Sequence, residues 1–343
     1  MKIAIHQSRI SYSGKWIEYC VENNIPYKVV DCYKSDIIAQ LNDCAGLMWH
    51  HYHMSAKDTL FAKQLLYAIE SSEKVVYPDF RTNWHFDDKL GQKYLLEAIN
   101  APLVPSYAFY SKQDSIDWVQ NITFPKVFKL RGGSGSANVR LVSTQREAIR
   151  LIKKAFEGGF SQYDVWPNIK ERWRKYRIDK VNFKEVVEGF GRFVLPTDYV
   201  HTHGKERGYV YFQDFIPNNE YDIRVTYVFN RCFALRRKVR PGDFRASGSG
   251  NIDYDMLKIP SKAIALSFDV ANKLRLQTAA FDFVILNDAP MILEVSYGFG
   301  DDFDQFNHGY WDSDLNYFPG TFNPYGWMVE GMINRIKDKN MKD

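Results

Sequence analysis

Two apolar runs, residues 281–286 and 291–296, constrain the fold of this chain more than any other stretch. Both are rich in β-branched and aromatic residues, and only a short polar interruption separates them, so they predict a β-hairpin. If the turn centres on Asp288, Asp282 faces Glu294 on one side of the sheet, with Cβ atoms about 5 Å apart. Two carboxylates this close repel each other, and burial adds to the cost. We therefore expect a proton or a cation between them.

Magnesium is the natural candidate for that cation. It is a hard ion that binds carboxylate oxygens and commonly completes its coordination with substrate phosphates. The alternative is an ordinary hairpin whose two acids are solvated on its outer face. The hairpin alone leaves both interpretations open.

Composition sets broad limits on the protein. A length of 343 residues indicates about two domains. With 45% hydrophobic and 25% charged residues, the chain can support a full core. The aromatic fraction of 16% is high and fits either deep pockets or an aromatic-rich core. A net charge of +4, dispersed along the chain, gives no argument for nucleic-acid binding.

The cysteines and the apolar stretches bear on the location of the protein. No two of the four cysteines form a CxxC pair, and we expect reduced thiols in a cytoplasmic protein. They are Cys20, Cys32, Cys44 and Cys232. The N-terminus is a short strand followed by polar residues, unlike a signal peptide. No stretch approaches the roughly 20 apolar residues of a membrane span.

The first 80 or so residues alternate short apolar runs with helical patterns, which predicts a small open α/β domain with a parallel sheet. The expected strands are 2–5, 27–30, 46–49 and 74–77, and the expected helices include 16–21 and 59–69. His50, His51 and His53 follow the third strand, where the loops of such sheets face ligands. We interpret them as surface histidines at a strand end, with substrate recognition as the alternative.

The middle of the chain carries a glycine-rich loop. A helix opened by residues 87–89 leads through a proline-containing linker to a strand at 124–130 and then to the loop at 131–139. Backbone N–H groups in such a loop can surround phosphate oxygens, and Lys129 supplies a charge beside it. The spacing is neither a Walker motif nor a GxGxxG fingerprint.

Residues 144–147 have the form of a capping box, which predicts that a helix follows. Residues 160–207 are polar, basic and aromatic, with the most basic run at 170–177. That run could be a solvated helical face or could bind nucleic acid. Further strands are expected at 208–216, 221–228 and 232–239.

The order of these features resembles the ATP-grasp superfamily over roughly residues 85–300. Within it, the chain looks most like the RimK-like glutamate ligases that modify a ribosomal protein. The motifs are the lysine with its glycine-rich loop, Gln213-Asp214-Phe215-Ile216, Asp222-Ile223-Arg224, Gly242-Asp243-Phe244-Arg245, and the acids Asp282 and Glu294. The resemblance implies an ATP-grasp fold, α/β and α+β in class, preceded by a small open α/β domain.

Three domains are expected on this basis. Residues 1–85 would form the N-terminal α/β domain. Residues 86–207 would form the central lid, with a linker and an insertion at about 160–207, because Lys129 and Gln213 are about twice as far apart as the resemblance implies. Residues 208–343 would carry the hairpin and an aromatic-rich tail that lines an acceptor pocket, closes the core or forms a homodimer face.

The resemblance also implies the residues that bind nucleotide. Lys89 and Lys129 would contact the phosphates. The glycine-rich loop would contribute Gly133, Ser134 and Gly135. Adenine would be held by Gln213, Asp214 and Phe215, largely through backbone groups. Asp222 would contact the ribose or the polar rim of the nucleotide.

The same resemblance assigns catalytic and metal roles. Arg237 and Arg245 would lie near the transferred phosphate, and Asp282, Glu294 and Ser296 would bind Mg²⁺, or Mn²⁺ in its place. Two positions depart from the pattern. Ser296 stands where the family has an asparagine metal ligand, and Ser247 replaces a second asparagine. A serine hydroxyl can ligate the ion, but its shorter reach can leave a water between them.

The activity implied is that of an ATP-dependent carboxylate–amine ligase. The γ-phosphate of ATP would pass to a substrate carboxylate, and an amine would attack the acylphosphate to form an amide, releasing ADP and phosphate. A nucleotide-binding module with little turnover and a kinase of a hydroxyl acceptor are the alternatives. The carboxylate and amine substrates are left open among peptides, small amino acids and sugar acids.

Overall fold

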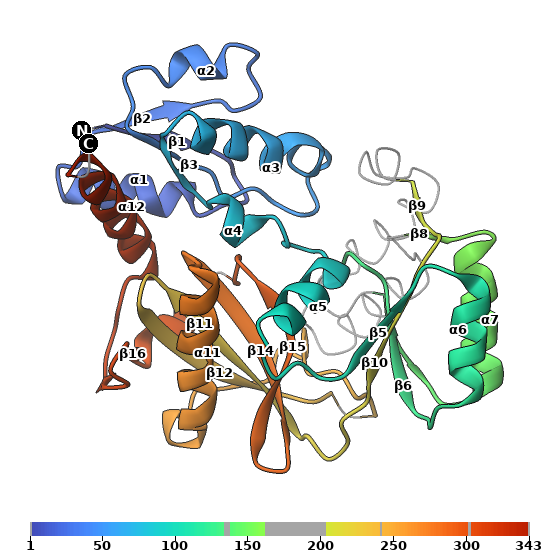
Figure 1. The fold of residues 1–343 in the computed structure, drawn as a ribbon. Helices are drawn as coiled ribbons and strands as arrows, with labels where there is room; N and C mark the ends of the chain where they lie inside the picture. The colour runs from blue at the N-terminus through green and yellow to red at the C-terminus, as the bar shows by residue number, and fades with distance from the viewer. Residues whose placement is uncertain (1, 134–137, 162–203, 241, 301–302, 342–343) are drawn as a thin grey trace, which may run out of the picture. The chain divides into compact units, whose positions relative to one another are not determined.

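A computed structural model describes residues 2–133, 138–161, 204–240, 242–300 and 303–341 (Figure 1). Within these ranges, no helix combines the length and the apolar character needed to cross a bilayer. The chain forms two compact units. The first comprises residues 1–86, 220–238 and 251–343, and the second comprises 87–219 and 239–250. Three domains with boundaries near residues 85 and 207 remain a prediction.

The first unit begins with a parallel sheet in the order β2-β1-β3-β4. Its strands are β1 (Ile3–His6), β2 (Tyr27–Val30), β3 (Gly46–Met48) and β4 (Val75–Tyr77). The helices between and after them are α1 (Ser13–Glu22), α2 (Ile37–Gln40), α3 (Ala56–Ser71) and α4 (Phe80–Asn83). The open α/β arrangement predicted from the alternating pattern is confirmed.

Both faces of this sheet are covered. One face packs against α3 through Leu47, Val76 and Leu66. The other face packs against α1 and against the C-terminal helix α12 (Pro324–Asn340), which lie side by side in Figure 1. The aromatic residues Tyr325 and Trp327 of α12 are buried in this core. For these two residues, the interpretation that the aromatic tail closes the core is confirmed.

The second sheet of this unit has the order β15-β14-β11-β12-β16-β17, with β13 paired to β12. The strands are β11 (Tyr221–Val228), β12 (Arg231–Lys238), β13 (Ile252–Asp253), β14 (Thr278–Leu286), β15 (Ala289–Ser296), β16 (Tyr310–Asp312) and β17 (Tyr317–Phe318). Helix α11 (Ser261–Leu274) covers one face, where Phe268 contacts Tyr227 edge to face. Two single-turn helices, η1 (Met256–Lys258) and η2 (Phe303–Asn307), lie in the connections.

The hairpin of β14 and β15 pairs Asp282 with Glu294, as predicted. The turn and the strand register that produce this pairing differ from the predicted turn centred on Asp288. The turn contains two residues, Asn287 and Asp288, both at positive φ (50° and 61°). The ladder shifts by one residue next to Asp282, so that Leu293 is an extra residue of a β-bulge. Without this bulge Leu293 would face Asp282, because a shift of one residue exchanges the two faces of a strand.

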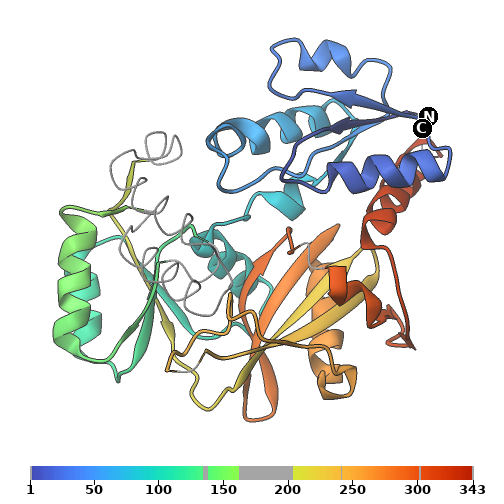
Figure 2. The same cartoon turned by 180° about the vertical axis from the view of Figure 1, so that it is seen from behind.

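The second unit has a sheet in the order β5-β10-β6-β7, entirely antiparallel. The strands are β5 (Ser106–Phe109), β6 (Lys126–Lys129), β7 (Val139–Val142) and β10 (Val210–Asp214). Figure 2 shows α6 (Lys112–Gln120) and α7 (Gln145–Phe156) together on one face, where they bury Phe128 and Phe212. The predicted cap of α7 is confirmed, because Thr144 accepts a hydrogen bond from the Glu147 N–H.

A short ladder joins β8 (Phe160–Ser161) to β9 (Lys205–Glu206) in this unit. Ser161 and Lys205, which are far apart in the sequence, are therefore neighbours in this unit. Residues 162–203, with the basic run at 170–177, lie outside the described residues. The insertion at 160–207 remains a prediction.

Candidate functional site

One face of the second sheet in the first unit is polar, and strand pairing explains why. The ladders place Arg237 opposite Asp222, Arg224 opposite Asp282, and Asp282 opposite Glu294. Residues directly opposite each other share a face, as do residues two apart on one strand. The side chains of the polar face therefore include Asp222, Arg224, Arg237, Asp282, Glu294 and Ser296.

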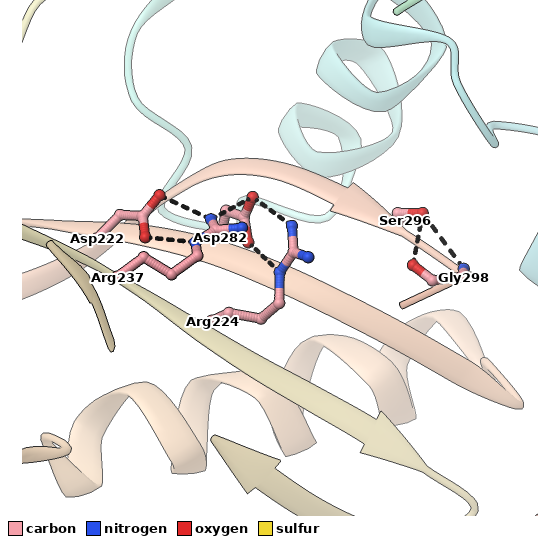
Figure 3. A network of polar contacts seen from close by, with 6 residues as sticks. All are labelled: Asp222, Arg224, Arg237, Asp282, Ser296 and Gly298. Atoms are coloured by element: carbon pink, nitrogen blue, oxygen red, sulfur yellow. Dashed lines mark hydrogen bonds and ion pairs between the residues drawn. The ribbon is translucent and has the colours of Figure 1, made fainter. Parts of the chain in front are cut away.

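Asp282 is buried between two arginines (Figure 3). Arg224 donates to both of its carboxylate oxygens at 2.7 and 2.8 Å, and Arg237 Nη2 lies 2.9 Å from Oδ2. Arg237 also donates two hydrogen bonds of 2.7 Å to Asp222. The paired acids were expected to need a proton or a cation between them. In this structure the positive charge beside Asp282 comes from guanidinium groups.

The two aspartates of this network differ in proton affinity. Burial raises the pKa of Asp222 to about 6, opposed by Arg237 and reinforced by the charge of Asp282. Burial also acts to raise the pKa of Asp282, but Arg224 and Arg237 together hold that pKa below its usual range. The difference follows from the contacts, because two guanidinium groups bind Asp282 and one binds Asp222.

The oxygen atoms on this face suit a hard divalent cation. Glu294 is half-buried opposite Asp282, and carboxylate oxygens are the ligands that Mg²⁺ prefers. Ser296 Oγ donates to the Gly298 carbonyl at 3.0 Å and accepts from the Gly298 N–H at 3.2 Å. Among the described residues, no group of three or more His, Cys, Asp or Glu side chains could hold a metal ion. The roles of Asp282, Glu294 and Ser296 as metal ligands remain predictions.

Lys129 belongs to a buried polar chain in the second unit. Its Nζ donates to Gln213 Oε1 at 2.6 Å, and Gln213 Nε2 donates to Ser106 Oγ at 3.0 Å. The Tyr211 hydroxyl also donates to Ser106 Oγ, at 3.0 Å. The Ser106 hydroxyl in turn donates to the Val104 carbonyl. The chain of bonds fixes which way the Gln213 amide points, and it places the ammonium group at the end of β6.

Lys89 and the glycine-rich loop meet at Gly133. Lys89 Nζ donates to the Gly133 carbonyl at 2.9 Å, and Asp87 accepts from the Gly133 N–H at 2.8 Å. Asp88 caps the helix α5 (Lys89–Ala98) by accepting from the Gly91 N–H, so Lys89 occupies its first turn. The structure thus brings Lys89 and Gly133 together, and their roles in binding phosphate remain predictions. Ser134 and Gly135 lie outside the described residues.

The remaining predicted nucleotide and phosphate contacts also lie in the second unit. Asp214 accepts from Lys126 Nζ at 2.6 Å, and the ladder of β10 ends at this residue. Phe215 follows the strand and contacts Phe244 edge to face. Arg245 donates to both carboxylate oxygens of Asp243, with distances of 2.6 to 3.0 Å. The adenine and phosphate roles of these residues remain predictions.

The interpretation of the histidines as surface residues is wrong for His51, which is 2% exposed. It packs against the rings of Phe86 and Tyr297, and burial lowers its pKa well below the usual value. His50 and His53 are partly exposed beside it. The loop after β3 is covered by aromatic residues far away in the sequence, which a strand-end pattern does not reveal.

Several residues of these networks were not predicted. Arg224 has a signal in the sequence, because it follows Asp222 by two positions on a strand and must share its face. Ser106, Tyr211 and Lys126 have no comparable signal. Their positions next to Gln213 and Asp214 depend on the pairing of β5 and β6 with β10.

Comparison with solved structures shows the fold. The chain is similar to a RimK domain ATP-grasp protein from Sphaerobacter thermophilus, with a TM-score of 0.57, 14% identity, and coverage of 97% of this chain and 100% of the other. For D-alanine–D-alanine ligase from Bacillus anthracis, the TM-score is 0.56, the identity 14%, and both chains are fully covered. The ATP-grasp ligase PsnB matches with a TM-score of 0.55 and 12% identity over 97% and 98% of the chains.

No family model and no curated protein sequence matches the chain. The structural likeness extends over nearly the whole length, so the chain has the ATP-grasp fold. The fold implied by the order of sequence motifs is confirmed.

Proposed function

We propose that the protein is an ATP- and Mg²⁺-dependent carboxylate–amine ligase. The observation that carries this proposal is the pairing of Asp282 with Glu294 on a polar face shared with Arg224 and Arg237, in a chain with the ATP-grasp fold. Solved neighbours include D-alanine–D-alanine ligase complexed with ATP and PsnB complexed with its minimal precursor, Mg and ADP.

In the proposed reaction, the γ-phosphate passes from ATP to a substrate carboxylate, and an amine then displaces phosphate to form the amide. Asp282 and Glu294 would hold Mg²⁺, which supplies positive charge to the phosphate oxygens. Lys89 and Lys129 would bind phosphates, and Arg237 and Arg245 would stabilise the transferring group. Catalysis of this kind rests on positioning and electrostatics, so no side-chain nucleophile is needed.

The contacts refine the expected role of Asp222. Its two carboxylate oxygens both accept hydrogen bonds from Arg237. This favours a role in orienting Arg237 over direct contact with the ribose. Gln213 would similarly position Lys129, in addition to its place in the adenine-binding strand.

A nucleotide-binding module with little turnover is the second candidate. It is favoured by Ser296, whose hydroxyl bonds to the backbone of Gly298 at the position where the ATP-grasp pattern has an asparagine ligand. If Ser296 keeps these bonds in the nucleotide complex, the ion loses one protein ligand.

The substitution Glu294→Gln tests the ligase proposal, after a product search with a panel of acids and amines has defined an assay. ADP release should require both a carboxylate and an amine. The substitution removes a charged ligand, so we expect turnover to fall at least about 100-fold, as when one electrostatic contact to a transition state is removed. ADP binding, measured by calorimetry, should persist.

Glu22→Gln serves as the control, because it removes the same charge from an exposed position at the end of α1. Unchanged turnover in Glu294→Gln would contradict the metal assignment. Nucleotide binding without ADP release over the whole panel would favour the binding module, and a phosphorylated product without amide would favour a kinase.

A further inference from the structure

Three loops of the first unit meet beside the polar face. Tyr12, after β1, has its hydroxyl 2.7 Å from both the N–H and the carbonyl of Phe299. Tyr297, after β15, donates its hydroxyl to the carbonyl of His51, after β3. The carboxyl ends of parallel strands are where α/β sheets bind ligands. Here two such ends are tied to the end of the strand that carries Glu294 and Ser296.

His50 is held in one orientation at this junction. Its ring stacks on Tyr12 with centroids 3.7 Å apart and an interplanar angle of 3°. Its Nδ1 accepts a hydrogen bond of 3.3 Å from the Tyr12 N–H. Burial lowers the pKa of His50 to about 3, so the ring is neutral near pH 7. A neutral imidazole that accepts at Nδ1 carries its proton on Nε2.

This Nε2–H lies next to the loop that follows β15. A Cβ atom built on Gly298 would lie 3.4 Å from His50 Nε2. Gly298 is also the hydrogen-bond partner of Ser296 on the polar face. His50 is partly exposed, whereas its neighbour His51 is buried. A neutral donor in a fixed position therefore adjoins the end of the strand with the proposed metal ligands.

We propose that His50 is a substrate-binding residue whose Nε2–H donates a hydrogen bond to a carboxylate oxygen of the acyl-donor substrate. The inference rests on the proposed ligase function and deepens it, because it assigns the acid to the junction of His50 and Gly298. An oxygen is the required partner, since an N–H group can only donate.

The same geometry excludes His50 as the base that deprotonates the amine. Its Nδ1 lone pair is engaged by the Tyr12 N–H, and its Nε2 holds the proton. The ring can bind and orient a substrate oxygen without changing its protonation state. This separates a binding role from general-base catalysis, in which the ring would have to gain a proton.

The test uses the full-length ¹⁵N-labelled protein saturated with magnesium ADP, with sodium acetate as the carboxylate probe and sodium chloride as the ionic-strength control. Long-range ¹H–¹⁵N spectra report the two ring nitrogens of each histidine. We expect acetate to shift His50 Nε2 saturably while Nδ1 keeps its unprotonated signal. The His308 ring, stacked on Tyr254, should not respond.

Two variants complete the test. His50→Phe keeps an aromatic ring against Tyr12 but removes the N–H, and we expect acetate binding to weaken about 10-fold or more, as for loss of a hydrogen bond to a charged group. Gly298→Ala leaves His50 intact and places a methyl group against Nε2, so it should suppress the acetate shift. Magnesium ADP should bind both variants as it binds the wild type.

The outcomes separate the role of His50 from the proposed ligase function. If magnesium ADP binds but acetate leaves His50 unmoved, the role of His50 is overturned and the proposed ligase function stands. If Nδ1 takes up a proton from solvent when acetate binds, the binding role is overturned in favour of a base. If magnesium ADP does not bind, the proposed function fails, and the assignment of His50 fails with it.

Discussion

Arg237 lies between two buried carboxylates and illustrates how single residues support this face. The exposed fractions of the side chains are 9% for Arg237, 10% for Asp222 and 6% for Asp282. Burying such groups is costly unless the charges are paired and hydrogen-bonded. Arg237 therefore offsets the cost of burying the carboxylates of Asp222 and Asp282. Arg224 adds a second positive charge beside Asp282.

Replacing Arg237 with methionine should destabilise the protein by about 3–5 kcal/mol, the cost of leaving buried charges without their partner. The free energy of unfolding from urea titration measures this loss. As a control, Lys273→Met removes an exposed partner of Asp269 on α11, and should cost less than about 1 kcal/mol. Equal stability of Arg237→Met and wild type would show that Arg237 does not neutralise Asp222 and Asp282.

At the scale of elements, two features set the register of the hairpin: its two-residue turn and its β-bulge. The turn at Asn287 and Asp288 needs positive φ at both positions, which suits a two-residue hairpin loop. The bulge at Leu293 then shifts the register by one residue and brings Glu294 opposite Asp282. The site depends on the bulge, because the turn alone would align a leucine with Asp282.

Asp288→Gly should stabilise the hairpin by about 1 kcal/mol, because glycine adopts positive φ without the strain of a side chain. Urea unfolding provides the measurement. Asp288→Ala is the matched control, since it removes the same charge but keeps a Cβ atom at a φ of 61°. If Asp288→Ala stabilises as much as Asp288→Gly, the gain comes from the lost charge and the backbone argument fails.

At the scale of the whole molecule, the C-terminal helix completes the N-terminal core. Helix α12 packs on α1, β4 and β11, so residues from both ends of the chain share one apolar cluster. Close approach requires glycine at Gly331, where a Cβ atom would lie 2.2 Å from the Phe229 ring. The last helix is thus a structural part of the fold that the first strands begin.

Gly331→Ala should destabilise the protein by about 1–3 kcal/mol, because the added methyl group overpacks the contact with Phe229. Gly14→Ala is the control, as Gly14 is exposed in α1 with no atom within 4 Å of a built Cβ. Alanine there should stabilise by about 0.5–1 kcal/mol. Calorimetric melting temperatures that rise for both variants would contradict the close packing of α12.

Local patterns in the sequence predicted much of the fold. The strand predicted at 27–30 has the observed bounds, and Asp88 and Thr144 cap helices near their predicted starts. Such signals work because capping and periodic burial depend on neighbouring residues. The burial of His51 was missed, since its cover comes from Tyr297, far along the chain.

The sequence by itself determined the alternation that puts Asp222 and Arg224 on one face, the presence of a hairpin at 281–296, and the order of motifs that implies ATP-grasp. The first two features follow from the two-residue period of a strand and from local turn chemistry, whereas the pairing of Asp282 with Glu294 depends on the bulge at Leu293. Only the tertiary structure decided that Arg224 and Arg237 neutralise Asp282 and that His50 adjoins Gly298. Those contacts depend on the pairing and packing of segments that are far apart in the chain.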